Sequence, residues 1–154
     1  MKILITNDDG INTIGIRLLT EWAKKLGEVI VVAPKVEQSA KSHAIEIAKP
    51  IEIKQIPYID GVRAYSMDST PADCIRYGVL GLKEKFDLVL SGINRGVNVG
   101  ADVVYSGTLG AIFEAARMGI PAATRPTKGR CISFEATSSV GETTLGCASG
   151  SGES

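Results

Sequence analysis

The hydrophobic positions of the chain fall into continuous runs, separated by segments in which apolar residues recur with helical spacing. The continuous runs cover residues 2–6, 28–33 and 86–91, and each is followed by polar residues. Runs of this kind are typical of strands buried on both faces of a parallel sheet. Between the first two runs, an amphipathic helix is predicted from the apolar positions Ile16, Leu18, Leu19, Trp22, Ala23 and Leu26.

The middle of the chain carries a second pattern, in which apolar and polar residues alternate. Residues 45–47 and 51–56 alternate in this way, which predicts two strands with one solvent-facing side at the edge of the sheet. Residues 62–66 form a further predicted strand. A helix is expected to begin after Thr70, which suits an N-cap because Pro71 follows it.

Helix and strand alternate again after residue 91, with a helix opening at residues 105–108 and a strand at residues 120–123. We therefore expect an α/β fold: a three-layer Rossmann-like domain with a mostly parallel sheet over residues 1–123, C-terminally truncated. Over residues 124–154, 16 of 31 residues are Ser, Thr or Gly. This low-complexity composition buries too little apolar surface to offset its ordering entropy, so we expect little stable structure in the tail.

Composition narrows the classes of partner. Lys and Arg number 17, and so do Asp and Glu, so no overall charge favours a nucleic-acid polymer or a membrane as partner. The three Cys residues are widely spaced, which argues against both a disulfide framework and a zinc ribbon. No signal peptide or transmembrane stretch is evident, and a cytoplasmic location is expected.

Three polar clusters follow predicted strands and should meet at the carboxyl edge of the sheet. They are Asp8 with Asp9, the loop around Ser39, and the Gly-rich and Asn-rich loop from Asn94 to Asn98. Adjacent carboxylates repel each other unless a cation lies between them, although Asn-Asp-Asp-Gly is also a common turn composition. Oxygen ligands of these types favour one divalent ion, Mg²⁺ or Mn²⁺, over zinc.

A candidate anion site lies at Ser106, Gly107 and Thr108, where a helix begins. Free N–H groups and the helix dipole favour phosphate there, while ordinary capping is the simpler interpretation. His43 is the only histidine, and either donates to phosphate or is a loop residue without a role. A cation beside a phosphate site is what phosphomonoester hydrolysis requires, with no covalent nucleophile.

At these residues the chain resembles the SurE (stationary-phase survival protein) nucleotidases. The resemblance covers residues 1 to about 122 and rests on residues 6–10, 32–34, 38–39, 70–74, 91–96, Asn98, Gly100, Asp102 and 105–108. It implies a metal-dependent phosphatase acting on nucleoside 5′- or 3′-monophosphates. Carried over position by position, it implies that the metal is held by Asp8, Asp9, Ser39 and Asn94, and that phosphate is bound by Asn98 and residues 106–108.

The resemblance also sets the alternatives. Members of the family continue for about as long again and carry an oligomerising extension, which residues 124–154 do not resemble. An inactive remnant that binds metal or nucleotide is therefore one alternative. A receiver-like signalling module is another, but it needs an acceptor Asp where this chain has Ser91. A haloacid-dehalogenase phosphatase is disfavoured, because Asp8 and Asp9 lack the intervening residue of that family's Asp-x-Asp motif.

Overall fold

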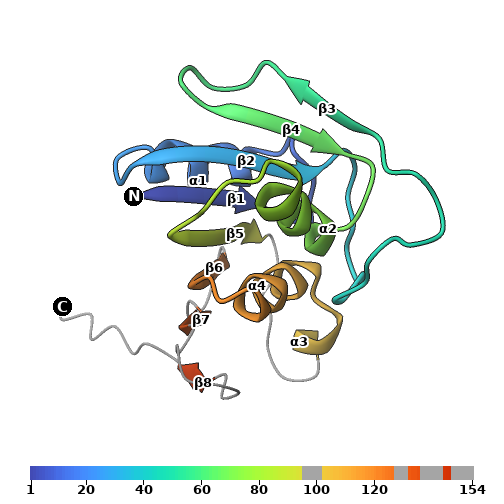
Figure 1. Ribbon diagram of the computed structural model, residues 1–154. Coiled ribbons are helices and arrows are strands. Elements are labelled where there is room, and N and C mark those ends of the chain that lie inside the picture. Colours follow the sequence, from blue (N-terminus) through green and yellow to red (C-terminus); the bar gives the residue numbers. More distant parts are fainter. Residues whose placement is uncertain (95–101, 127–131, 136–143, 147–154) are drawn as a thin grey trace.

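A computed structural model describes residues 1–94, 102–126, 132–135 and 144–146. One eight-stranded sheet with helices on both faces is its core, as the α/β prediction requires (Figure 1). The strands are β1 (Lys2–Thr6), β2 (Glu28–Pro34), β3 (Ile53–Ile56), β4 (Arg63–Met67), β5 (Leu88–Asn94), β6 (Ala122–Pro126), β7 (Ile132–Glu135) and β8 (Thr144–Gly146). The helices are α1 (Ile14–Ala23), α2 (Pro71–Arg76), α3 (Asp102–Tyr105) and α4 (Gly107–Arg117), with a π-helical turn at Tyr77–Gly81 after α2.

The order of the strands is β3-β4-β2-β1-β5-β6-β7-β8. Strands β4, β2, β1, β5 and β6 are parallel, whereas β3 pairs with β4, β7 with β6, and β8 with β7 in antiparallel fashion. Strand β1 lies at the centre of the parallel part, with Thr6 opposite Ser91 of β5. The carboxyl ends of β1 and β5 therefore meet at one edge of the sheet, as the sequence predicts.

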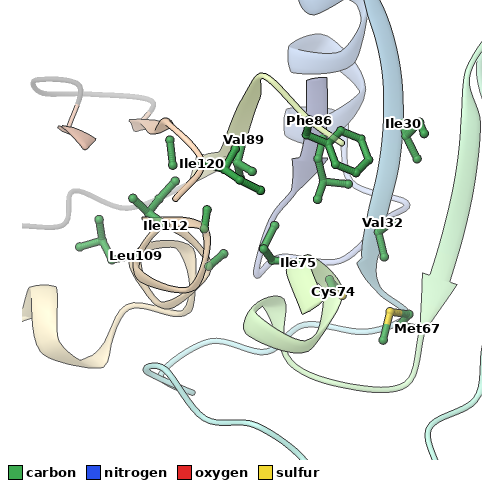
Figure 2. Close-up of a cluster of buried hydrophobic side chains, with 14 residues drawn as sticks. Ile30, Val32, Met67, Cys74, Ile75, Phe86, Val89, Leu109, Ile112 and Ile120 are labelled. Carbon is green, nitrogen blue, oxygen red and sulfur yellow. The ribbon is translucent and has the colours of Figure 1, made fainter. Parts of the chain in front are cut away.

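The alternation of side chains along β1 divides the core between the two faces of the sheet. Leu4 points toward α2 and α4, into a cluster that Figure 2 shows around Ile75, Leu109 and Ile112. Ile3 and Ile5 point the other way, against α1. In Figure 1, α2 and α4 accordingly lie in front of the sheet and α1 behind it. Burial on both faces explains why the central strands are continuous apolar runs.

Two details of the predicted elements are wrong. Helix α1 buries Ile16, Leu19 and Ala23, but Leu18 and Trp22 are exposed, because their side of the helix faces away from the sheet. The helix ends at Ala23, so Leu26 lies beyond it and is exposed as well. Residues 45–47 form no strand, and the Glu46 amide instead donates to Asp73 Oδ2, in the first turn of α2, at 2.8 Å. The edge excursion is confirmed only for β3, which is shorter than predicted.

Regular structure continues past residue 124, where the sequence predicts little of it. Strand β6 reaches Pro126, and β7 and β8 extend the sheet by antiparallel pairing. Pairing supplies backbone hydrogen bonds to segments whose composition offers few apolar side chains. The division of the chain into a core over residues 1–123 and a tail over residues 124–154 stays a prediction.

Candidate functional site

The turn after β1 is built by Asn7, which is fully buried. Its side-chain amide donates to the Gly10 carbonyl and to Thr13 Oγ1, both at 3.0 Å, and its Oδ1 accepts from the Gly10 amide at 3.2 Å. Gly10 has φ +104°, a conformation that glycine adopts without strain. These bonds close the turn and place Asp8 and Asp9 just beyond the end of the central strand.

Asp8 is only 5% exposed. Its Oδ1 accepts a hydrogen bond from the Thr108 hydroxyl at 2.7 Å, and its backbone carbonyl accepts from the Gln38 amide at 2.7 Å. Burial raises the pKa of Asp8, and hydrogen bonds from the Thr108 hydroxyl and backbone oppose that rise without cancelling it. The structure thus keeps a carboxylate where its charge is unfavourable without a cationic partner.

Helix α4 begins directly against Asp8. Ser106 is its N-cap, and the Ser106 hydroxyl accepts from the Leu109 amide at 3.3 Å, so capping occurs as the simpler interpretation of this motif expects. A Cβ added at Gly107 would lie 3.0 Å from Asp8 Cβ and 3.1 Å from the Gln38 carbonyl oxygen. Gly107 therefore lets the helix terminus approach both the turn after β1 and the loop after β2. Phosphate binding at this terminus stays a prediction.

The other predicted residues lie on the elements expected. Asp9 follows Asp8 in the same turn, and Asn94 ends β5, the neighbour of β1; both are partly buried and have interactions of their own. Ser39 is exposed in the loop after β2, and its hydroxyl donates to Glu37 Oε1 at 2.7 Å. Asn98 lies outside the described residues. The metal and phosphate roles of these side chains stay predictions.

Two carboxylates near the site are not singled out by the sequence analysis. Glu37 is close enough for its charge to contribute to the raised pKa of Asp8. Glu114, on α4, accepts a hydrogen bond at 2.7 Å from Nε2 of His43, the residue considered above as a phosphate donor. The sequence offers one signal for Glu114: it is a charged residue within the apolar stripe of its helix.

The side chains around Asp8 fit a hard divalent cation by their donor chemistry. Asp8 Oδ1 is engaged by Thr108, whereas Oδ2 lies 3.4 Å from the Cβ position of Gly107, on the side of the helix terminus. Among the described residues, no three His, Cys, Asp or Glu side chains form a group that could hold a metal ion. The predicted set, which adds a hydroxyl and an amide oxygen to two carboxylates, has the donor types that such a cation takes, and it stays a prediction.

Beneath the site, three buried hydroxyls lie in one row across the central strands. Thr6 of β1 is opposite Ser91 of β5, which is opposite Thr124 of β6. All three are at most 3% exposed, and within the described part of the chain the Ser91 and Thr124 hydroxyls have no hydrogen-bond partner, while Thr6 has at most a weak one in the Cys74 thiol. Such groups are rare in folded proteins, because an unpaired buried hydroxyl is unfavourable.

Fold and site together define a class: a Rossmann-like α/β protein whose polar residues gather where parallel strands end and a helix begins. Comparison with known proteins gives the family. A family model described as Survival protein SurE matches residues 3–140, so the chain belongs to the SurE family, and the predicted resemblance is confirmed. The match extends past residue 122, where the predicted resemblance ends.

Relatives of this chain are named 5′-nucleotidase SurE. The protein of Thermoanaerobacter sp. (strain X514) is 49% identical over 123 residues, which are 79% of this chain and 49% of the relative. The protein of Clostridium beijerinckii is 52% identical over 123 residues, 79% of this chain and 48% of the relative. The chain thus spans about half the length of the curated relatives it matches.

A solved structure supports the fold. The crystal structure of the SurE protein from Aquifex aeolicus matches with a TM-score of 0.71 and 40% sequence identity, over 79% of this chain and 49% of that one. The mostly parallel Rossmann-like sheet is therefore confirmed as the architecture of the chain. Within the described residues, no helix has the length and hydrophobicity needed to cross a membrane.

Proposed function

We propose that this chain carries the metal-binding and phosphate-binding part of a phosphomonoesterase that hydrolyses nucleoside 5′- and 3′-monophosphates to nucleoside and phosphate. The names of its relatives support 5′-nucleotidase activity. Dependence on Mg²⁺ or Mn²⁺, activity on 3′-monophosphates and a cytoplasmic location are proposals that rest on the sequence analysis. A family-like homo-oligomer is a proposal too. The oligomerising extension that the resemblance implies lies in the part of the relatives that this chain does not span.

One observation carries the proposal: the hydrogen bond of 2.7 Å between Thr108 Oγ1 and Asp8 Oδ1. It joins the first turn of α4, where a phosphate group is favoured, to the carboxylate that is best placed to hold a cation. A phosphoryl group bound there would contact both sites at once. Hydrolysis of phosphate esters depends on this juxtaposition, because charge develops on the phosphoryl oxygens as the ester bond breaks.

The division of labour follows from the residues. Asp8, Asp9, Ser39 and Asn94 would hold the cation, which when bound would supply Lewis acidity to the phosphoryl group. Backbone amides at Gly107 and Thr108 and the side chain of Asn98 would orient the phosphate. Asp8, Asp9 and Asn94 are the proposed catalytic residues. His43 stays a weaker candidate for phosphate binding, because its Nε2 atom already contacts Glu114.

The proposal is tested by measuring phosphate release from nucleoside monophosphates with and without Mg²⁺ or Mn²⁺. Release should require the metal and should be lost in Asp9→Asn, which keeps the shape of the side chain and removes its charge. Glu21→Gln is the matched control, since it removes an exposed carboxylate from α1. Metal-independent release by Asp9→Asn would reject the assignment.

The same assay separates the remaining alternative. A remnant without activity would bind a nucleoside monophosphate and metal in calorimetry while releasing no phosphate. A chain restored to the length of its relatives should then regain the activity. The receiver-like alternative loses support, because Ser91 occupies the relevant strand position on β5 and is fully buried.

A further inference from the structure

Glu114 is a buried carboxylate that nitrogen atoms from three parts of the fold contact. Its side chain is 3% exposed and contacts His43 Nε2 at 2.7 Å, Arg76 Nη1 of α2 at 3.2 Å and Arg117 Nη2 of its own helix at 2.7 Å. Burial alone would raise the pKa of Glu114, but hydrogen bonds from Arg117, His43 and Arg76 outweigh it and lower the pKa to about 2. Glu114 is thus a charged anchor at neutral pH.

His43 is the group through which this anchor reaches the loop after β2. Its ring also packs near Phe113, with ring centroids 6.3 Å apart. The preceding residue adds to the contact, because the Ser42 amide donates to the Tyr105 carbonyl at 3.1 Å and the Ser42 hydroxyl to the Val104 carbonyl at 2.7 Å. Ser42 is therefore fixed on the C-terminal end of α3, and His43 on the second half of α4.

The loop backbone lies directly on the helix at this point. Gly110 of α4 faces the Ser42 carbonyl so closely that a Cβ at residue 110 would collide with it. The absence of a side chain lets the loop and the helix backbone touch. This contact places the loop on the same helix whose first turn contacts Asp8.

The other end of the segment is fixed at the candidate site. The Gln38 amide donates to the Asp8 carbonyl at 2.7 Å. Ser39 is therefore one residue from an attachment at Asp8 and four residues from the attachment at Glu114. Between them, Ala40 and Ser42 adopt left-handed backbone conformations, with φ values of 59° and 54°. Residues other than Gly and Asn disfavour the left-handed backbone conformation, so the contacts at the two ends of the segment must hold Ala40 and Ser42 in it.

We propose that Glu114 is a positioning residue which, by holding His43, fixes residues 38–43 in this strained conformation and so determines where Ser39 lies relative to Asp8. The part of the inference that concerns a metal rests on the proposed function. The part that concerns the loop does not, because it follows from contacts within this chain alone.

Hydrogen exchange of the full chain without added metal tests the loop. His43→Leu removes the donor to Glu114, whereas His43→Gln keeps a side-chain N–H donor and should behave more like the unchanged protein. In His43→Leu we expect the amides of Ser42 and Gln38 to exchange at least about tenfold faster, with the β1 amides unchanged. Glu114→Gln should give an intermediate result, because its amide oxygen still accepts a hydrogen bond.

Arg117→Gln is the matched control, because it removes another partner of Glu114 without touching the loop. It should lower the melting temperature and leave exchange at Gln38 and Ser42 unchanged. If His43→Leu leaves both amides protected, or exposes Ser42 alone, the attachment does not reach Ser39 and the proposal is overturned. The proposal would also be overturned if the Gln38 amide exchanged as fast in His43→Gln as in His43→Leu. Any change at residue 43 would then have the same effect.

Titration with Mn²⁺ adds a second readout. His43→Leu should weaken Mn²⁺ binding by about tenfold, as loss of outer-shell support does at other metal sites, and His43→Gln should restore most of it. If the unchanged protein binds no Mn²⁺, the metal part of the proposed function fails, while the exchange result still decides whether Glu114 positions the loop. If Mn²⁺ binds equally to both His43 variants, the positioning of Ser39 is refuted.

Discussion

Replacing Thr108 with Val isolates the hydrogen bond on which the candidate site depends. The two side chains have nearly the same shape, so the substitution leaves no cavity and removes only the hydroxyl that donates to Asp8 Oδ1. Thr108 is fully buried and Asp8 is 5% exposed, so water cannot readily replace the lost donor. The variant should therefore leave a buried carboxylate with one hydrogen bond fewer.

The size of the effect follows from the charge of the acceptor. A hydrogen bond to a charged group contributes about 1.5–3 kcal/mol to the free energy of unfolding. Backbone amides also donate to Asp8, which favours the lower half of this range. We expect Thr108→Val to lower the free energy of unfolding by about 2 kcal/mol at neutral pH. Thr108→Ser keeps the hydroxyl and loses one buried methyl group, which costs about 0.8 kcal/mol.

The dependence on pH separates the two variants. In the folded protein the pKa of Asp8 is raised above its ordinary value of 3.8. The contribution of Asp8 to the free energy of unfolding is therefore fully favourable at a pH below 3.8, and it is lost as the pH rises through the pKa of the folded state. Thr108→Val removes a hydrogen bond that lowers the pKa of Asp8, so the pKa should be higher in the variant. The free energy of unfolding should therefore fall more in the variant than in the unchanged chain as the pH is raised. Its destabilisation should therefore shrink at about pH 3, whereas that of Thr108→Ser should not change.

Urea unfolding followed by circular dichroism, in the presence of a chelator, measures these differences. The free energy of unfolding would be compared at neutral pH and at about pH 3 for the two variants and the unchanged chain. A destabilisation of Thr108→Val that is the same at both pH values would refute the reasoning, because it would mean that the hydroxyl does not act on the charge of Asp8.

Two further predictions concern the candidate site, and a third concerns the edges of the sheet. Asp8→Asn should raise the free energy of unfolding at neutral pH, since it removes a charge that burial disfavours, and calorimetry should show that Mn²⁺ binding is lost. Gly107→Val should abolish phosphate binding in calorimetry; the sequence alone suggests an intact fold, but contacts of 3.0 Å and 3.1 Å at the added Cβ predict a destabilisation of about 1–3 kcal/mol. Size-exclusion chromatography should show self-association, because among the strands that the structure describes the antiparallel edge strands β3 and β8 each have one side unpaired; a sharply folding monomer would contradict this.

The parallel part of the fold is predictable because burial on both faces of the sheet leaves a plain pattern in the sequence. Leu4 and Ile5 point to opposite faces and are both fully buried, so β1 reads as a continuous apolar run. Residues 45–47 mislead because alternation also occurs in a loop whose hydrogen bonds go to a distant side chain, here Asp73. The local pattern of apolar and polar residues carries no information about this distant partner.

The candidate site is predictable for a similar reason, and only to the same extent. Residues that follow parallel strands emerge at one edge of the sheet, so the sequence groups Asp8 with Asn94 at that edge. Their position on neighbouring strands depends on the pairing of β1 with β5, which the order of strands along the chain does not give. The bond between Asp8 and Thr108 joins positions 100 residues apart, and the contact between His43 and Glu114 joins positions 71 apart. Such pairs depend on how helices pack on the sheet, which spacing along the chain does not encode.

The row of buried hydroxyls across β1, β5 and β6 offers a route to a more robust form of this chain. Ser91→Ala and Thr124→Val each remove a buried group that has no hydrogen-bond partner within the described residues, and Thr6→Val removes one whose partner is at most the Cys74 thiol, all at little change of volume. Removing such a group avoids a desolvation penalty of about 1–3 kcal/mol. A triple variant should therefore melt at a higher temperature and withstand more denaturant, which would give the site variants proposed above a host that tolerates their losses.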